Sequence, residues 1–256
     1  MSHDQHVTDQ FDRTAERYRT SAVHAQGSDL ATLRAVAERL HPAAALDVGC
    51  GPGHASFAMA PFCERVHAVD ASGEMLRVAA DEARRRNLAQ ITIHRAPATD
   101  LPFPDASMDL VSCRYSAHHW RDVDAGLAEI VRVLKPDGVF VLTDSIGYEA
   151  PLADTHLQTI ELLRDTSHVR SYRASEWVAT LGCHGLVPWH CDFFRVRLAF
   201  DEWVERSQTP PGRVAVIRQL LADAPLEVRR AFAIADDGSL ELDVLTCQAR
   251  RVAYPS

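Results

Sequence analysis

The chain has 256 residues, enough for one large domain, and 46% of them are hydrophobic, which allows a substantial core. The net charge of −8 argues against a general affinity for nucleic-acid phosphates, and no apolar run approaches the roughly 20 residues of a membrane helix. The N-terminus lacks the hydrophobic region of a signal peptide and the six cysteines show no C-x-x-C spacing, so we expect a cytoplasmic protein with reduced thiols.

The first predicted element is an amphipathic helix near the N-terminus. Its apolar residues recur at helical spacing and share one face: Val7, Phe11, Ala15, Tyr18 and Ala22. Such a helix either packs permanently on the core or acts as a lid that excludes water from a site. In the second case we expect Phe11, Tyr18 and His24 to face a substrate.

A glycine-rich turn follows the next apolar run. Residues 43–48 predict a buried strand, a helix starts near His54, and Gly49, Gly51 and Gly53 lie between them. Glycine has no Cβ, so a ligand can pack directly on the backbone, and the start of a helix offers free amide N–H groups. The turn therefore predicts a ligand site at the end of this strand.

The acidic residue Asp70 closes the following apolar segment, R-V-H-A-V-D. In nucleotide-binding α/β units, a carboxylate at this place accepts hydrogen bonds from ribose hydroxyls. A dinucleotide fingerprint requires G-x-G-x-x-G, but the spacing here is G-x-G-x-G and His54 occupies the third-glycine position. The pattern argues against a dinucleotide, although an oxidoreductase that uses one stays open as an alternative.

Strands and helices then alternate, which is typical of a mostly parallel sheet covered on both faces. We expect a helix over 74–86 that is capped by Ser72 and ends near Asn87. Strands are expected at 91–95, 108–113 and 139–143, with a helix over 124–134 that stops at K-P-D-G. Beyond these elements we expect helices over 152–163, 176–181 (ended by Gly182), 213–222 and 226–235, and strands over 186–194 and 240–249.

The motif L-D-V-G-C-G-P-G, with Asp47 before the glycines and Asp70 at the end of the second strand, resembles the first motif of class I S-adenosylmethionine-dependent methyltransferases. The segments L-P-F-P-D-A-S-M-D-L-V and E-I-V-R-V-L-K-P-D-G-V-F-V-L, with a histidine pair between them, are similar to the small-molecule branch, which includes ubiquinone and menaquinone biosynthesis enzymes. The resemblance covers roughly residues 40 to 145 and implies a Rossmann-like α/β fold with a seven-stranded, mostly parallel sheet. It implies a single domain with an N-terminal helical lid (1–40), a cofactor-binding core (41–145) and a segment (146–256) that completes the sheet and adds a helical insertion.

The resemblance also implies S-adenosylmethionine as the cofactor and a small organic molecule as the methyl acceptor. Asp70 would bind the ribose, the glycines the methionine and ribose portion, and Asp47 would orient the amino-acid end through the turn. The expected cofactor contacts are Asp47, Gly49, Cys50, Gly51, Gly53, Asp70, Ala71, Ala98, Thr99 and Arg114. Pro97 stands where the family often has an acid near the adenine, so either Asp100 or the backbone around Ala98 would make that contact.

A histidine pair follows the fourth predicted strand, where the loops of an α/β sheet line the ligand crevice. The sulfonium methyl is already a strong electrophile, so a base is needed only when the acceptor must lose a proton. Either His118 or His119 would be that base, or both shape the pocket wall. The expected substrate contacts are Phe11, Tyr18, His24, Tyr115, Asp144, His168 and Arg170. As alternatives, Asp144 caps a helix or belongs to a turn, and Arg114 and Tyr115 are packing or rim residues.

The other polar residues of note form three groups. His168, with Arg170 and Arg173, would hold a carboxylate or phosphate of the acceptor, or belong to a solvated loop. We expect Asp109 to have a structural role and to anchor the neighbouring backbone. The last group has side chains of types that bind metals: Cys183, His184, His190 and Cys191. Adjacent strand residues point to opposite faces, so we expect no metal site there.

The sequence leaves the methylated atom open among oxygen, carbon and nitrogen. A protein that binds S-adenosylmethionine but catalyses a non-methylating reaction, such as a cyclisation, is one alternative. A non-catalytic binding module is another.

Overall fold

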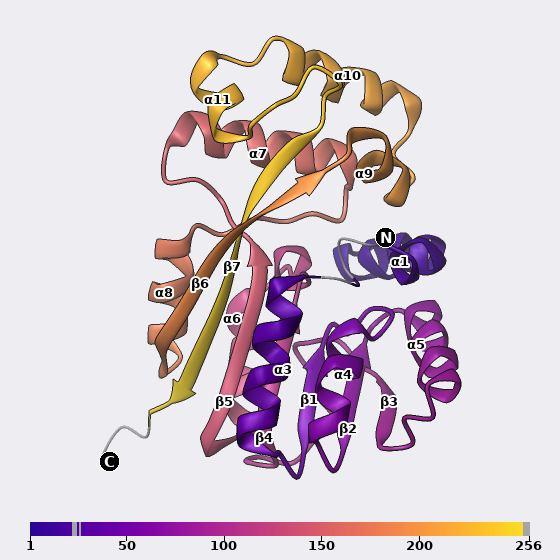
Figure 1. Cartoon of the computed structure of the whole chain (residues 1–256), viewed down its shortest axis with the longest axis vertical. Helices are drawn as coiled ribbons and strands as arrows, with labels where there is room; N and C mark the ends of the chain where they lie inside the picture. The colour runs from indigo at the N-terminus through magenta and orange to yellow at the C-terminus, as the bar shows by residue number, and fades with distance from the viewer. Residues whose placement is uncertain (22–24, 26, 253–256) are drawn as a thin grey trace.

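A seven-stranded sheet forms the centre of the molecule, in the order β3-β2-β1-β4-β5-β7-β6. The structure, a computed structural model, describes residues 1–21, 25 and 27–252 (Figure 1). Strands β1 to β5 run parallel, whereas β7 is antiparallel to both β5 and β6, which confirms the predicted Rossmann-like α/β fold. The strands are β1 (Ala45–Val48), β2 (Val66–Asp70), β3 (Ile91–Arg95), β4 (Met108–Arg114), β5 (Leu134–Ser145), β6 (Leu186–Leu198) and β7 (Leu240–Arg251).

Helices cover both faces of the sheet because the central strands are apolar on both sides. One face packs against α3 (Ser28–Leu40), α4 (His54–Met59) and α5 (Gly73–Arg85), and the other against α6 (Val123–Val133) and α8 (Ala174–Cys183). Two short 3-10 helices, η1 (Ala60–Phe62) and η2 (Ala117–His119), follow α4 and β4. The strand order reverses between β1 and β4, and a ligand crevice is expected at the carboxyl ends of these two strands.

The local predictions for α5 are confirmed. Ser72 Oγ accepts a hydrogen bond from the Met75 amide at 3.1 Å, and Asn87 has the left-handed φ of 57° that suits the residue after a helix. Asp109 also has its predicted structural role, because its Oδ2 accepts a hydrogen bond from the Ala44 amide at 3.0 Å.

Strands β6 and β7 extend far beyond the parallel strands and carry a second group of helices (Figure 1). This predicted helical insertion contains α7 (Pro151–Arg164), α9 (Phe200–Arg206), α10 (Pro211–Ala222) and α11 (Leu226–Ala231). Its apolar cluster includes Leu157, Trp203 and Phe232, and Leu240 and Leu242 of β7 belong to the same cluster. The insertion therefore has an apolar core of its own, built on the extended strands.

Several predicted boundaries are wrong in this part of the chain. Strand β6 continues to Leu198 because it pairs with β7 along its whole length, and α11 ends at Ala231. Gly182 lies inside α8 and does not end it, since the residue with a left-handed φ, of 71°, is Gly185. The segment K-P-D-G belongs to β5, which begins directly after α6. Helix α9 was not predicted at all.

Helix α1 (His3–Arg19) lies across the carboxyl ends of the parallel strands, between the sheet and the insertion (Figure 1). Asp12 Oδ1 accepts hydrogen bonds from Ser72 Oγ and the Glu74 amide, and Gln10 Nε2 donates to the Ser207 carbonyl at 2.8 Å. The predicted lid of residues 1–40 is thus divided, because α3 is a core helix and only α1 covers the strand ends. No helix within the described part of the chain is both long and apolar enough to cross a membrane.

Candidate functional site

The turn between β1 and α4 places three glycines in the left-handed backbone region. The φ angles are 68° at Gly49, 51° at Gly51 and 95° at Gly53, a conformation that residues with a Cβ rarely adopt. A Cβ on Gly49 would lie 2.0 Å from Ser116 Oγ, whereas a Cβ on Gly51 would meet no atom closer than Met75 Sδ at 4.0 Å. Gly49 is therefore required by packing, and Gly51 leaves space for a ligand.

Asp70, at the end of β2, is held by the same turn. Its Oδ2 accepts a hydrogen bond from the Gly51 amide at 2.9 Å, and its Oδ1 accepts one from the Ser72 amide at 2.8 Å. Burial raises the pKa of Asp70 to about 6. A carboxylate offers about four acceptor positions, so further donors can still be accommodated.

Asp47 supports the turn from within the core. It is buried, and its two oxygens accept hydrogen bonds from Ser56 Oγ at 2.6 Å and Ser112 Oγ at 3.0 Å. These contacts join α4 and β4 behind the glycines. Asp47 therefore holds the turn in position, and we expect its effect on a ligand to act through the turn.

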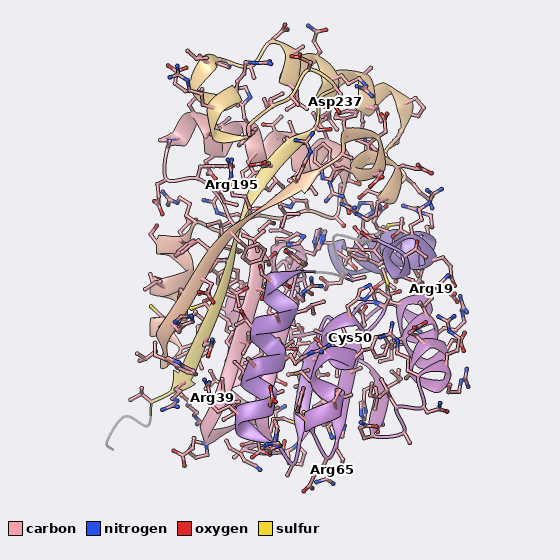
Figure 2. The ribbon with its side chains drawn as sticks, in the orientation of Figure 1. Arg19, Arg39, Cys50, Arg65, Arg195 and Asp237 are labelled. Atoms are coloured by element: carbon pink, nitrogen blue, oxygen red, sulfur yellow. The ribbon has the colours of Figure 1, made fainter. Side chains whose placement is uncertain are left out.

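A cavity of about 1180 Å³, counting the space open to solvent, lies over the turn. All the predicted cofactor contacts line it except Gly53, where a Cβ would lie 2.6 Å from the Phe57 ring; Gly53 contacts its own helix and not the cavity. Cys50, labelled in Figure 2 near the carboxyl ends of the parallel strands, is part of this lining. Burial raises the pKa of the Cys50 thiol well above its usual value, which argues against a role as a nucleophile.

The segment after β3 borders the cavity with backbone and small side chains. Its residues Ala96 to Thr99 line the cavity, whereas Asp100 does not. Of the two predicted ways to contact an adenine, the structure therefore favours the backbone around Ala98. Met75 and Trp120 are among the lining residues that were not predicted as contacts. Trp120 could have been predicted as a lining residue, because it directly follows the histidine pair in the loop after β4.

Arg114 has a structural partner as well as a place at the cavity. Its Nε donates a hydrogen bond to Asp29 Oδ2, and both side chains are almost fully buried. This ion pair fixes α3 to the end of β4. Because the charge of Arg114 is already paired with Asp29, its predicted contact with the cofactor would not supply an unpaired positive charge.

A second cavity, of about 600 Å³, adjoins the first. The two cavities share Phe11, Tyr18, Tyr115 and His119 as lining residues, and His118 lines only the second. The remainder of the second cavity comes from α7, α9 and the extended parts of β6 and β7. It lies between the cofactor-binding core and the helical insertion, with α1 contributing to both cavities.

His118 is bound by Asp144, which follows from the register of β4 and β5. Asp144 Oδ2 accepts a hydrogen bond from the His118 amide at 3.1 Å, and His118 Nδ1 donates to Asp144 Oδ1. Burial lowers the pKa of His118, but the charge and hydrogen bond of Asp144 outweigh burial, and the pKa lies above its usual value. Asp144, predicted as a substrate contact, is therefore the partner of His118 and lines neither cavity.

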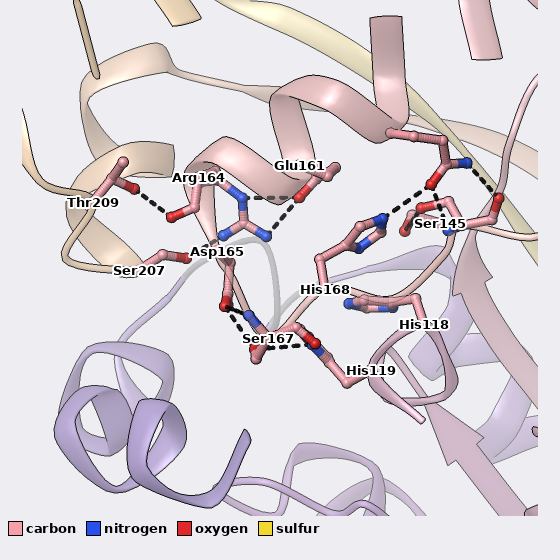
Figure 3. A network of polar contacts seen from close by, with 12 residues as sticks. His118, His119, Ser145, Glu161, Arg164, Asp165, Ser167, His168, Ser207 and Thr209 are labelled. Carbon is pink, nitrogen blue, oxygen red and sulfur yellow. Dashed lines mark hydrogen bonds and ion pairs between the residues drawn. The ribbon is translucent and has the colours of Figure 1, made fainter. Parts of the chain in front are cut away.

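His119 has a different environment, shown in Figure 3. Its Nδ1 lies 3.1 Å from both the carbonyl oxygen and the Oγ of Ser167, and Ser167 Oγ donates to Asp165 Oδ1 at 2.6 Å. Burial and the neighbouring His118 lower the pKa of His119 well below its usual value. His119 is thus neutral, and its ring packs edge-on against Phe11 with 4.9 Å between the centroids.

His168 and Arg170 were predicted as substrate contacts, but they line neither cavity. His168 is buried, its Nε2 lies 3.0 Å from Gln158 Oε1, and burial lowers its pKa to about 3, so it carries no charge to hold an anion. The Arg170 guanidinium pairs with Glu176 at 3.0 Å. The predicted substrate contact His24 lies outside the described residues.

The residues considered as metal ligands are dispersed. His184 pairs with Asp124 at 2.9 Å, His190 pairs with Asp192 at 3.1 Å, and Cys191 lies beside Cys247. Over residues 1–21, 25 and 27–252, no group of three or more histidine, cysteine or acidic side chains is placed to hold a metal ion.

Comparison with known proteins identifies the family. Residues 46–142 match the family model described as a methyltransferase domain. An uncharacterized methyltransferase of Bacillus subtilis (strain 168), YcgJ, is 37% identical over 224 residues, which cover 88% of this chain and 88% of YcgJ. The chain belongs to the class I S-adenosylmethionine-dependent methyltransferases.

Two further comparisons agree with this assignment. The crystal structure of YcgJ superimposes on the methyltransferase with a TM-score of 0.84 and 33% identity, covering 89% of this chain and 99% of YcgJ. The uncharacterized protein YafE of Escherichia coli (strain K12) is 40% identical over 205 residues, which cover 80% of this chain and 99% of YafE.

The cofactor of the methyltransferase is S-adenosylmethionine, and the first cavity fits it. Gly51 admits close approach to the backbone, and Asp70 presents a partly buried acceptor for ribose hydroxyls. Ala96, Ala98 and Met75 add small and apolar surface for a planar base.

We expect the affinity for S-adenosylhomocysteine to fall as the pH decreases below 6. Because burial raises the pKa of Asp70 to about 6, the carboxyl group gains a proton below that pH and loses acceptor capacity for the ribose. Between pH 7 and pH 5 the dissociation constant should increase about tenfold, measured by isothermal titration calorimetry. The Asp70→Asn variant should bind more weakly at pH 7 and show no such pH dependence. An unchanged affinity of the wild type at pH 5 would contradict the role of Asp70.

Proposed function

We propose that the methyltransferase transfers a methyl group to an oxygen, carbon or nitrogen atom of a small organic metabolite that binds in the second cavity. The observation that carries this proposal is the junction of the two cavities at Phe11, Tyr18, Tyr115 and His119. The first cavity fits the cofactor, and the second is bordered by apolar side chains and both predicted catalytic histidines. The net charge of −8 supports a small molecule rather than a nucleic acid, and a cytoplasmic biosynthetic or tailoring reaction fits this reading.

The chemistry required of the protein is limited. S-adenosylmethionine supplies an electrophilic methyl group, so the residues of the protein orient the acceptor and remove its proton where it has one. We assign the removal of the proton to His118 Nε2. The other ring nitrogen, Nδ1, donates to Asp144, and this hydrogen bond leaves Nε2 as the basic atom of a histidine that lines the second cavity.

His119 has a positioning role in this proposal. It lines both cavities, and its contacts with Ser167 and Phe11 fix the orientation of its ring. A neutral imidazole at the junction of the two cavities can hydrogen-bond an acceptor without a charge that would repel the cationic cofactor. Phe11 and Tyr18 of α1 cover the same junction, which supports α1 as the part of the N-terminal segment that shields the reactants from water.

The proposal is tested with methyl-labelled S-adenosylmethionine and an extract of the source organism. The extract is separated into small-molecule, protein and nucleic-acid fractions before incubation with the enzyme. We expect the label in the small-molecule fraction, and we expect the Asp70→Ala variant to lose this transfer. Label that enters only protein or nucleic acid would contradict the proposal. A metabolite whose structure changes without gaining label would instead favour a non-methylating reaction.

A further inference from the structure

We propose that the acceptor is an organic anion, a carboxylate on an apolar carbon skeleton, and that Arg206 binds its carboxylate group. This inference rests on the proposed function, because it names the class of molecule that the second cavity selects. The cavity borders both the reacting histidines and Arg206, so one molecule can contact both ends of it.

The wall of the second cavity is largely apolar. Val196 and Leu198 of β6, Val244 of β7 and Trp203 of α9 all line it. These side chains come from the long antiparallel strands and from the helix that follows β6. Such a surface binds a hydrocarbon or aromatic skeleton through the hydrophobic effect.

Two arginines line the same cavity, and one of them is already neutralised. Arg164 donates to Glu161 Oε2 from Nε at 2.9 Å and from Nη2 at 2.8 Å, and both residues are buried (Figure 3). Arg164 also donates to Ser207 Oγ. The Arg164–Glu161 pair therefore contributes no net charge to the cavity. His118 and Asp144 form a second pair whose charges balance when His118 is protonated.

Arg206, the last residue of α9, has no acidic partner within ion-pair distance among the described residues. Its Nη1 lies 3.4 Å from Ser21 Oγ, and its guanidinium lies 5.9 Å from the centre of the Tyr18 ring. Its Nε is buried and has no hydrogen-bond partner within the described part of the chain. Glu202, one turn earlier on α9, is exposed and forms no ion pair with it.

Of the two arginines that line the second cavity, Arg206 is therefore the one that no carboxylate contacts among the described residues. Arginine stays protonated at all physiological pH values, so its charge cannot be removed by loss of a proton. A partly buried cation without a carboxylate in contact is unfavourable, and a carboxylate that enters the cavity would pair with its charge and accept a hydrogen bond from its Nε. The anion site that the sequence suggested at His168 and Arg170 thus lies at Arg206.

The test measures binding to protein saturated with S-adenosylhomocysteine, using calorimetry and two matched pairs of probes. Octanoate is compared with octanamide, and 4-phenylbutyrate with 4-phenylbutyramide. We expect at least one carboxylate to bind about tenfold or more tightly than its amide, as expected for a hydrogen-bonded charge pair. Arg206→Met should remove this preference, and Arg206→Lys should retain part of it. Arg65→Met is the control, because Arg65 is exposed and lies at the opposite end of the molecule (Figure 2).

Three results would overturn the inference: a wild type that binds neither carboxylate, equal affinity for acid and amide, or an Arg206→Met variant that keeps the preference. The affinity for S-adenosylhomocysteine is measured for each protein in the same series. A wild type that fails to bind S-adenosylhomocysteine would count against the proposed function. Normal cofactor binding without a carboxylate preference would count against Arg206 alone. The melting temperature of Arg206→Met should equal or exceed that of the wild type, because the variant removes an unpaired, partly buried cation.

Discussion

Replacing His118 by alanine is expected to lower kcat by about 10²- to 10⁴-fold for an acceptor that must lose a proton, the usual range for general-base catalysis. Binding of S-adenosylhomocysteine should not change, because His118 lines the second cavity and not the first. The measurement is steady-state release of S-adenosylhomocysteine with an acceptor found by the labelling experiment. His184→Ala is the matched control, since His184 also pairs with an aspartate but lies outside both cavities.

The role of Asp144 is separated from a purely structural one by the pH profile. A base must be neutral, so activity is lost as the pH falls through the pKa of His118. Because Asp144 raises the pKa of His118, Asp144→Asn should reduce kcat and also move this acidic limb to lower pH. A reduced kcat with an unmoved acidic limb would show that Asp144 only supports the fold. Full activity of His118→Ala would exclude it as the base.

Replacing Gly49 by alanine is expected to lower the free energy of unfolding by about 2–5 kcal/mol, the sum of the costs of a left-handed alanine and of overpacking. The φ of Gly49 is 68°, and the new Cβ would lie 2.0 Å from Ser116 Oγ and 2.6 Å from Ser116 Cβ. The turn must shift to relieve this contact. The shift should move the Gly51 amide away from Asp70 and weaken S-adenosylhomocysteine binding by at least about tenfold.

Gly212→Ala provides the comparison for Gly49→Ala. Gly212 lies in α10, its φ is not in the left-handed region, and nothing lies within 4 Å of the position of its Cβ. Alanine there should leave stability unchanged or increase it by up to about 1 kcal/mol, since alanine favours helix. Denaturant unfolding and calorimetry of both variants give the two free energies. Equal stability of the Gly49 and Gly212 variants would show that the turn tolerates a side chain.

Local patterns were sufficient to predict the parallel half of the fold. Strand β3 has its predicted bounds, and the Ser72 cap and the Asn87 end of α5 follow from hydrogen bonds within a few residues. The cofactor cavity was predictable because the glycine turn directly follows β1 and Asp70 is the last residue of β2. Both features could be located in the sequence from these two neighbouring strands. Asp144 could have been assigned to His118 from the expected sheet, since β4 and β5 are adjacent and parallel.

The residues of the second cavity could not be predicted in the same way. Their positions depend on contacts between distant segments, which the spacing of apolar residues does not reveal. Arg170 is neutralised by Glu176, and Arg206 lacks an acidic partner among the described residues, yet both read as ordinary basic residues in the sequence. Helix α9 has only seven residues, too few for a helical pattern to stand out. The extended end of β6 was missed because its stability comes from pairing with β7, some 40 to 65 residues later in the chain.

The long antiparallel pair of β6 and β7 has a consequence for how this enzyme can change its specificity. The cofactor cavity is built from α1 and residues 47–122, whereas most of the second cavity comes from residues 145–244, with an apolar core of its own. If the acceptor binds in the second cavity as we propose, substitutions on β6, β7 and α9 are expected to change which molecule is accepted without altering the cofactor cavity. Among the described residues, four line both cavities and must fit both ligands: Phe11, Tyr18, Tyr115 and His119. In this proposal the insertion determines which acceptor binds, while the cofactor-binding core stays unchanged.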